Sequence, residues 1–151
     1  MKQLVIMLMV FIPILSFAPN NSFYLYKESD FIYEVSIIAH IESRYKLDAF
    51  NESENAVGLL QIRQTVIDDV NKFFNKNYTI NEMYNPFVAV TVLNLYREMY
   101  RVPLKELHLL WNGGPGYKSK KLSKYKSKYK TSRSNVVQQK EIREREAGQK
   151  G

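Results

Sequence analysis

The sequence predicts a small, mainly α domain whose helices are joined by irregular loops. Apolar residues recur at helical spacing in several stretches, and clear helix-start and helix-stop signals bound them. Runs with the two-residue alternation of strands are few. With 151 residues, the chain is long enough for one domain with a modest core. We expect an irregular loop, or a short hairpin, after the first helix of the domain.

The first predicted helix covers residues 31–45, with Asp30 as its N-cap. Residues 19–30 are polar and aromatic without a helical period, and are interpreted as a linker. The apolar stripe of the helix consists of Phe31, Val35, Ile38, Ile41 and Tyr45.

Two acids and a histidine lie on this helix. Glu42 falls inside the apolar stripe, four residues after Ile38. Glu34 is near the stripe, but in the first predicted turn, where an acid suits the helix dipole. His40 is on the polar face and is interpreted as a solvated histidine.

The middle of the chain predicts a loop and two helices. Residues 46–57 lack a helical period, residues 65–74 are predicted helical, and residues 75–84 form a polar connector. Asn85-Pro86 is typical of a helix start, with Asn as N-cap and Pro in the first turn. This helix runs to about residue 100, and its predicted apolar face consists of Val88, Val92, Leu95 and Met99.

A short helix follows over residues 104–111. It ends at residues 112–116, Asn-Gly-Gly-Pro-Gly, which form a strong helix-breaking cluster. The domain is therefore expected to cover residues 31–117.

The N-terminus predicts a secretory signal peptide over residues 1–18. Met1-Lys2 is a short basic region, an apolar run follows, and Ala18 ends a small-x-small cleavage site. The alternative is an uncleaved membrane anchor, against which the shortness of the run and Pro13 argue. An exported protein, periplasmic or extracellular, is expected.

The chain has no cysteine and two histidines. Thiol catalysis and Cys-ligated metals are therefore excluded, and a His-rich zinc site is disfavoured. We expect no metal and no cofactor.

Positive charge is concentrated in a tail over residues 118–151. This tail has twelve Lys or Arg and three Glu, a net charge of +9, whereas residues 1–117 carry −2. Such a tail favours an anionic polymer such as the cell wall or an acidic lipid surface, and export makes nucleic acid the weakest candidate. Residues 131–151 are expected to fray or to be disordered. Alternatively, residues 117–130 form a last amphipathic helix that packs on the domain.

Glu42 is the candidate for chemistry. Desolvation by apolar neighbours disfavours an ionised carboxyl and raises its pKa, and a glutamate that stays protonated near neutral pH can act as a general acid. The structural alternative is a helix-end glutamate that points to solvent or pairs with Arg44 or Lys46.

Four elements in order resemble the lytic transglycosylase family. They are Glu42-Ser43 with Tyr45 and Ala49, the run Asn55-Ala56-Val57-Gly58-Leu59-Leu60-Gln61, the helix start Asn85-Pro86, and Trp111-Asn112-Gly113-Gly114-Pro115. The corresponding family patterns are Glu-Ser, Gly-Ala-x-Gly-Leu-Met-Gln, Asp-Pro and Tyr-Asn-Ala-Gly-Pro. The resemblance implies a lysozyme-like fold, similar to goose-type lysozymes, and peptidoglycan glycan strands as the substrate. We expect a monomer.

The resemblance also implies a role for each matching residue. Glu42 matches the catalytic acid/base, and Ser43 the hydroxyl that orients it or contacts the sugar. Gly58 lets the backbone approach the glycan, and Gln61 matches the glycan-contacting glutamine. The remaining substrate-binding candidates are Leu60, in place of the usual Met, and Trp111, Asn112 and Gly113.

Two departures bear on the site. Asn55 replaces the first glycine of the family pattern. Trp111 replaces the usual tyrosine, and an indole N–H can donate a hydrogen bond but cannot accept one. The missing hydroxyl can come from Tyr117 or Tyr125, and Trp111 itself can be a core residue.

Three functions remain open. The first is a lytic transglycosylase that cleaves the MurNAc-GlcNAc β-1,4 bond with Glu42 alone and leaves a 1,6-anhydro-MurNAc end. The second is a muramidase in which Asp48, Glu52 or Glu54 places a water. The third is a non-catalytic protein that binds the cell wall.

Overall fold

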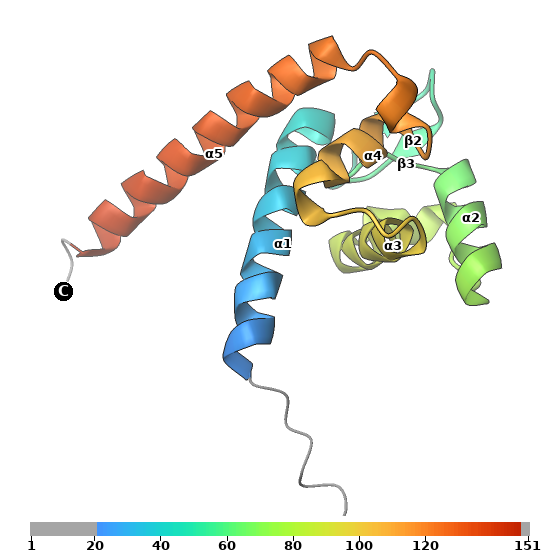
Figure 1. Ribbon diagram of the computed structural model, residues 1–151, viewed down its shortest axis with the longest axis horizontal. Helices are drawn as coiled ribbons and strands as arrows, with labels where there is room; N and C mark the ends of the chain where they lie inside the picture. The colour runs from blue at the N-terminus through green and yellow to red at the C-terminus, as the bar shows by residue number, and fades with distance from the viewer. Residues whose placement is uncertain (1–20, 149–151) are drawn as a thin grey trace, which may run out of the picture. The chain divides into compact units, whose positions relative to one another are not determined.

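The computed structural model describes residues 21–148 (Figure 1). The predicted signal peptide, residues 1–18, lies outside them. Residues 1–31 and 32–151 form two compact units, and the candidate chemistry lies in the second. Within the described residues, no helix has the length and apolar character needed to span a membrane.

A long helix, α1 (Asn21–Ser43), leads into a small antiparallel sheet. The strands β1 (Phe50–Asn51), β2 (Ala56–Val57) and β3 (Ile62–Arg63) are neighbours in chain order. Phe50 pairs with Val57, and Val57 pairs with Ile62. The hairpin expected after the first helix is therefore present, with a third short strand added.

Two helices and a 3-10 turn follow the sheet. They are α2 (Gln64–Phe74), η2 (Ile80–Tyr84) and α3 (Pro86–Met99). Asn85 caps α3 as predicted, because its Oδ1 accepts a hydrogen bond from the backbone N–H of Phe87 at 3.0 Å. The buried face of α3 differs from the predicted stripe, since Val88, Leu95 and Met99 are only half-buried. It consists of Ala89, Val92, Leu93 and Tyr96.

The C-terminal part contains two more helices and two short 3-10 turns. These elements are η3 (Leu104–Glu106), α4 (Leu107–Gly113), η4 (Tyr117–Ser119) and α5 (Ser123–Gly148). The predicted stop after Trp111 is confirmed within two residues, since Gly114 has a φ of 67° and ends α4. The mainly α prediction is confirmed.

The core of residues 32–151 is continuous from α1 through the sheet to α4. Its fully buried aliphatic side chains have less than 2% of their surface exposed, and they are Ile37, Ile38, Leu60, Ile62, Ile67, Met83, Leu93, Leu107, Leu110, Val70 and Val92. Burial of each such side chain stabilises the fold by about 1.5–3 kcal/mol before entropy is counted. Without disulfides, this core carries the stability of the domain.

Three predictions for the first helix were wrong. The predicted linker is helical from Asn21 onward, since no Gly or Pro lies between residues 20 and 57 and extending a formed helix is cheap. Glu34 is consequently in mid-helix, where it is buried rather than placed at the helix start. Tyr45 was predicted to be buried, but it is 41% exposed and lies beyond the helix with a φ of 66°.

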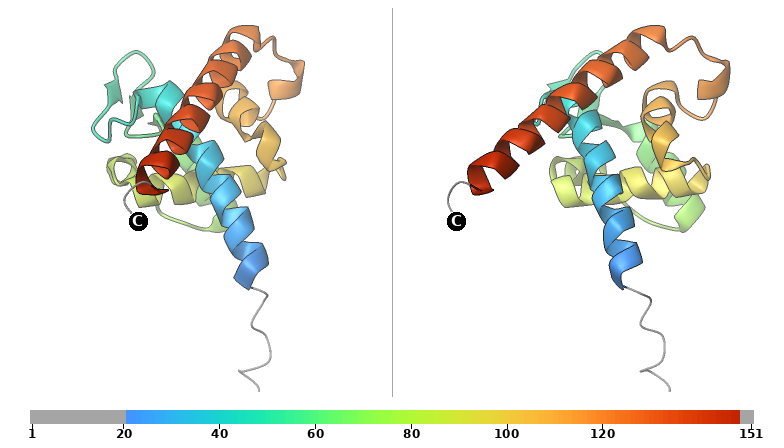
Figure 2. Two further views of the ribbon diagram at one scale, coloured as in Figure 1. Left: turned by 90° about the vertical axis from the view of Figure 1, so that its left-hand side faces the viewer. Right: turned by 60° about the vertical axis from the view of Figure 1, so that its left-hand side comes forward.

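The basic tail differs from the expected disorder, because α5 is helical to Gly148. The alternative of a packed last helix describes its first half. Tyr125, Tyr129 and Ser132 are buried, and α5 lies against α1 and α4 (Figures 1 and 2). These residues recur at spacings of four and three, so they share one helix face, whereas the lysines between them are exposed.

Two buried contacts hold α5 in place. The hydroxyl of Tyr129 donates a hydrogen bond to Oε2 of Glu34 at 2.5 Å. The Tyr129 ring also stacks on His108 of α4, with ring centroids 3.6 Å apart. Burial lowers the pKa of His108 to about 4, helped by the nearby charges of Lys126 and Arg133. His108 is therefore neutral in this contact at physiological pH.

Candidate active site

A polar cavity of about 260 Å³ opens beside the C-terminal end of α1. The sheet region, α4 and α5 supply its other walls. Its lining residues are Ile41, Glu42, Asn51, Glu54, Gln61, Arg63, Trp111, Asn112, Tyr125 and Lys128. Four of the eight predicted site residues, Glu42, Gln61, Trp111 and Asn112, are therefore brought together although they span 71 positions of the chain.

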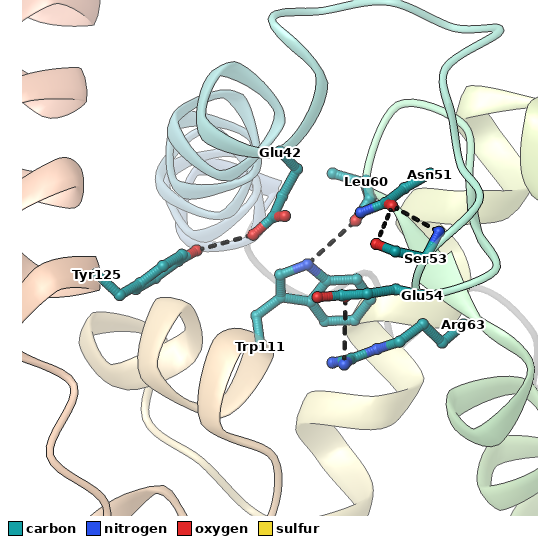
Figure 3. A network of polar contacts seen from close by, with 8 residues as sticks. All are labelled: Glu42, Asn51, Ser53, Glu54, Leu60, Arg63, Trp111 and Tyr125. Carbon is teal, nitrogen blue, oxygen red and sulfur yellow. Dashed lines mark hydrogen bonds and ion pairs between the residues drawn. The ribbon is translucent and has the colours of Figure 1, made fainter.

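Glu42 projects into this cavity from the last turn of α1 (Figure 3). Burial raises the pKa of its carboxyl above the ordinary value, and the negative charge of Glu54 raises it further. A hydrogen bond from Tyr125 and the charges of Arg63 and Lys128 act in the opposite direction. The site thus favours a proton on Glu42 while holding partners for the carboxylate that forms when the proton leaves.

Tyr125 supplies the hydroxyl that Trp111 cannot. Its Oη lies 3.2 Å from Oε1 of Glu42, across from the carboxylate in Figure 3. Burial and the neighbouring Glu42 raise the pKa of Tyr125 far above the usual range, so the phenol remains protonated and acts as a donor. Of the two tyrosines considered from the sequence, Tyr117 instead donates to Glu106 at 2.5 Å.

Trp111 forms one wall of the cavity and is also part of the core. It is 6% exposed, and its indole N–H donates to the backbone carbonyl of Leu60 at 3.1 Å (Figure 3). Its ring meets Tyr96 edge-on, with centroids 6.2 Å apart. The indole N–H is therefore engaged with the backbone and is not directed at Glu42.

Gln61 lines the cavity in a left-handed backbone conformation, with a φ of 52°. Its amide nitrogen donates to the carbonyls of Ala49, at 3.2 Å, and Gly58, at 3.0 Å. These two bonds tie the loop before β1 to the turn after β2. The amide oxygen keeps its acceptor capacity, because only the nitrogen is used in these bonds.

Gly58 was expected to admit the glycan, but the backbone of η2 occupies the space beside it. A Cβ at Gly58 would lie 2.3 Å from the carbonyl oxygen of Met83, and the φ of Gly58 is 73°. Its N–H donates to the carbonyl of Ala49 at 2.7 Å. The glycine is thus required by close packing of two protein segments, and not by an open groove.

Three further candidates lie outside the cavity lining. The hydroxyl of Ser43 faces the backbone carbonyls of Leu59, at 2.8 Å, and Ala39, at 3.2 Å. Leu60 is completely buried, so its side chain serves the core. Gly113 is packed against Tyr117 and Leu122, where a Cβ would lie 2.7 Å from the Tyr117 Cβ. Their observed contacts are structural.

Tyr125 was considered from the sequence only as one of two possible sources of a hydroxyl. The other lining residues not predicted as part of the site are Asn51, Arg63 and Lys128. Arg63 forms an ion pair with Glu54, another lining residue, at 3.6 Å (Figure 3). Both side chains are more than a third exposed, so the pair contributes little stability. Asn51 accepts hydrogen bonds from the backbone and hydroxyl of Ser53. No local sequence signal marks Asn51, Arg63 and Lys128, because β1, β3 and α5 come together only in the folded chain.

Of the three loop acids considered from the sequence, Glu54 alone is among the residues lining the cavity. Asp48 and Glu52 are exposed elsewhere in the loop. His40, predicted to be solvated, is half-buried, and its Nδ1 lies 3.1 Å from the Ser132 hydroxyl. Among residues 21–148, no group of three His, Asp or Glu side chains is arranged to hold a metal ion.

The chain matches the model of one known protein family. The model of the transglycosylase SLT domain matches residues 23–134, which is well over half of the sequence and reaches into α5. No curated protein matches, and no solved structure matches. The match confirms the mainly α, lysozyme-like fold, the resemblance to lytic transglycosylases and peptidoglycan as the substrate. The chain belongs to the transglycosylase SLT domain family, whose enzymes cleave the glycan strands of peptidoglycan.

Proposed function

We propose that the protein is a lytic transglycosylase in which Glu42 is the single general acid/base. It cleaves the β-1,4 bond between N-acetylmuramic acid and N-acetylglucosamine and leaves a 1,6-anhydro-N-acetylmuramic acid end. One observation carries this proposal. Glu42 lines the polar cavity with a raised pKa, and a tyrosine hydroxyl lies 3.2 Å from its carboxylate.

In the first step, protonated Glu42 gives its proton to the glycosidic oxygen. The bond between C1 of the muramic acid and that oxygen breaks, and the glucosamine leaves with a new hydroxyl group. Positive charge develops at C1 while Glu42 becomes a carboxylate. The hydroxyl of Tyr125 stabilises this carboxylate because a hydrogen bond to an ionised acceptor is stronger than one to a neutral acceptor.

In the second step, the C6 hydroxyl of the same muramic acid attacks C1. Its proton passes to the Glu42 carboxylate, which restores the acid for the next turnover. The product is the anhydro sugar, and no water is consumed. One carboxyl group serves both steps, so no second acid is needed.

Gln61 and Asn112 are the proposed glycan contacts. Both line the cavity, and Asn112 is exposed at the end of α4. The free amide oxygen of Gln61 can accept a hydrogen bond from a sugar hydroxyl or an N-acetyl N–H. Trp111 contributes an aromatic wall, while Ser43, Gly58, Leu60 and Gly113 support the site through the contacts described above.

Glu54 favours one alternative, a muramidase of the same fold. It lines the same cavity and its charge acts on Glu42. A carboxylate that positions a water opposite the acid would give hydrolysis with an added water in the product. Against this role, Glu54 is held by Arg63 and more than half of its side-chain surface is exposed.

Export is part of the proposal, since peptidoglycan lies outside the cytoplasm. The basic region and apolar run of residues 1–18 support a signal peptide and a periplasmic or extracellular site of action. The exposed lysines of α5 support weak, salt-sensitive attraction to anionic wall polymers. A monomer suffices for this chemistry, because every proposed residue comes from one chain.

Mass spectrometry of digested peptidoglycan tests the proposal. Purified glycan strands are incubated with the wild-type protein and with Glu42→Gln, which keeps the size of the side chain. The wild type is expected to release fragments with anhydro ends, and Glu42→Gln none. Glu54→Gln serves as the second variant, and it is expected to leave the anhydro product unchanged in kind.

The two alternative functions, a muramidase and a non-catalytic wall-binding protein, predict different outcomes. Fragments that carry an added water, lost in Glu54→Gln, would establish the muramidase instead. If a folded wild-type protein releases no fragments and binds strands as well as Glu42→Gln does, the protein binds the wall without cleaving it.

A further inference from the structure

We propose that a second, basic cavity beside Glu42 binds a carboxylate of the peptide stem that muramic acid carries. This inference rests on the proposed function, because it assumes that a muramic acid binds next to Glu42. The cavity has a volume of about 350 Å³ and lies between the end of α1 and the first half of α5. Its lining residues are His40, Ile41, Arg44, Ser127, Lys128, Thr131, Ser132 and Asn135.

The composition of this lining suits an anion. Arg44 and Lys128 bring two positive charges, and no acidic residue is among the lining residues. Among the described residues, neither cation has an ion-pair partner within 4.0 Å. The Ser127 hydroxyl and the Asn135 amide of α5 provide further hydrogen-bond donors. The hydroxyls of Thr131 and Ser132 are already bonded, to the Ser127 carbonyl and to His40. A guanidinium group is particularly suited to carboxylates, because its parallel N–H groups match the two oxygens.

The wall formed by α5 is ordered before any ligand arrives. Ser127, Thr131 and Asn135 follow one another at spacings of four, so they share one helix face. Ser132 beside them is 6% exposed, and its hydroxyl lies 3.1 Å from Nδ1 of His40. This contact between two lining residues joins α5 to α1, so the polar groups need little rearrangement to receive a ligand.

The backbone at Arg44 is also informative. The residue after the last turn of α1 has a φ of 53°, a left-handed conformation in which glycine is the usual residue. An arginine there costs free energy relative to glycine, because its Cβ crowds the backbone. The chain nevertheless places an exposed cation at this position, at the edge of the cavity.

The two cavities are neighbours. Ile41 and Lys128 line both of them, so the basic cavity adjoins the one that contains Glu42. Muramic acid carries its peptide stem on a lactyl group at C3, while its C1 is the reacting carbon. A muramic acid at Glu42 therefore has an anionic substituent on the same ring, within reach of an adjoining basic cavity. Glucosamine has no such substituent, so the cavity would identify which sugar lies next to Glu42.

A binding measurement tests this without depending on catalysis. The probe is N-acetylmuramyl-L-alanyl-D-glutamate, and the comparison compound is its diamide, which lacks both carboxylates. Calorimetry is performed on the Glu42→Gln protein, so that turnover does not interfere. We expect the dicarboxylate to bind at least about tenfold more tightly than the diamide, since hydrogen bonds to charged groups are the strong ones.

Arg44→Gly is the informative variant. Glycine relieves the left-handed backbone, so loss of folding is not expected to accompany loss of the charge. This variant should lose the preference for the dicarboxylate, and Arg44→Lys should recover part of it. The matched control is Lys124→Gln, which removes an exposed lysine of α5 that is not among the lining residues of either cavity. It should keep the full preference.

A second experiment measures whether the basic cavity affects the rate of cleavage. The kcat/KM on strands with intact stems is divided by that on strands whose stem carboxylates have been converted to amides. The ratio should fall about tenfold in Arg44→Gly and stay constant in Lys124→Gln. An unchanged ratio in Arg44→Gly would overturn the inference even if cleavage is confirmed. Equal binding of the dicarboxylate and the diamide by the Glu42→Gln protein would overturn it as well.

Two further outcomes separate the inference from its alternatives. If the protein cleaves nothing but still prefers the dicarboxylate through Arg44, the proposed function fails and the basic cavity stands. If a glycerol phosphate polymer competes through Arg44 more effectively than the muramyl peptide, the cavity serves a wall phosphate, and the assignment to the peptide stem is wrong.

Discussion

The hydroxyl of Tyr125 lies 3.2 Å from Oε1 of Glu42, although 83 positions separate the two residues. One belongs to the helix that opens the domain and the other to the helix that closes it. This contact makes the proton affinity of Glu42 a joint property of both ends of the chain.

The pH dependence of cleavage is expected to have a single limb. Glu42 must start protonated, and burial raises its pKa, so kcat/KM should fall as the pH rises through that pKa. Tyr125→Phe removes the hydrogen bond that lowers the pKa, so the limb should move to higher pH. At the same time kcat should fall about 10- to 100-fold through loss of the bond to the carboxylate.

The measurement is a rate profile on soluble glycan strands for the wild type and Tyr125→Phe. Tyr117→Phe is the control, because its hydroxyl donates to Glu106 rather than to Glu42. A second limb on the acid side, removed in Glu54→Gln, would contradict the single acid/base and support a water-placing carboxylate.

Glu42 should cost the protein stability at neutral pH. Its folded-state pKa is raised by burial, so the folded state holds the proton more tightly than the unfolded chain does. The stabilisation this provides is complete below the unfolded pKa and is lost as the pH rises through the folded pKa. Glu42→Gln should therefore raise the melting temperature above the folded pKa and have little effect well below the unfolded one.

Thermal unfolding followed by circular dichroism at several pH values measures this difference. Glu52→Gln, at an exposed loop position, is the control and should show no such pH dependence. Equal shifts of the Glu42→Gln melting temperature at all pH values would mean that the carboxyl is not desolvated.

Gly58→Ala should destabilise the fold even without substrate. The added Cβ would meet the Met83 carbonyl oxygen at 2.3 Å, and the φ of 73° is unfavourable for alanine. We expect a loss of more than about 1 kcal/mol in the free energy of unfolding, measured with urea. Gly116→Ala is the control, because its φ is −88° and its nearest neighbour is 3.8 Å away. Equal stabilities of the two variants would restore a role for Gly58 in substrate approach.

Trp111→Phe tests the hydrogen bond that the Trp111 indole N–H donates to the Leu60 carbonyl. Phenylalanine keeps an aromatic wall but leaves the Leu60 carbonyl without its indole partner. The expected loss is about 1–3 kcal/mol in the free energy of unfolding. If activity disappears while urea unfolding is unchanged, Trp111 acts on the substrate and its structural role is minor.

We expect α5 to contribute to the stability of the folded domain. Tyr129→Phe leaves the buried Glu34 carboxyl without its hydroxyl donor, and a loss of about 1–3 kcal/mol is expected from urea unfolding. Lys130→Ala, at an exposed neighbouring position, is the control. Full stability of Tyr129→Phe would show that α5 contributes little to the folded domain.

Local signals predicted much of the fold. The Asn85-Pro86 start of α3 and the glycine stop after α4 depend on neighbouring residues alone, and both are present. Glu42 was found because its position in an apolar stripe and its sequence context agreed. The buried face of α3 was shifted because the stripe alone cannot tell which side meets the core, and Ala89 and Tyr96 are ambiguous by composition.

Contacts between distant segments explain the remaining errors. The lysine-rich composition of α5 hides the fact that Tyr125 and Tyr129 find partners more than eighty residues earlier. Gly58 was assigned to the substrate because the sequence does not show that the Met83 backbone occupies its open side. Ser43 likewise appeared as a neighbour of the catalytic acid, while its hydroxyl is committed to Leu59.

The position of α5 at the end of the folding domain has a consequence for when the protein can act. A ribosome makes Glu42 long before it makes Tyr125 and Tyr129, so a partly synthesised chain has the acid without its phenol partner. A chain clipped by a protease before α5 returns to the same condition. Lytic activity, which is dangerous to a cell wall, is therefore expected to begin only when the last helix has docked and to end when that helix is removed.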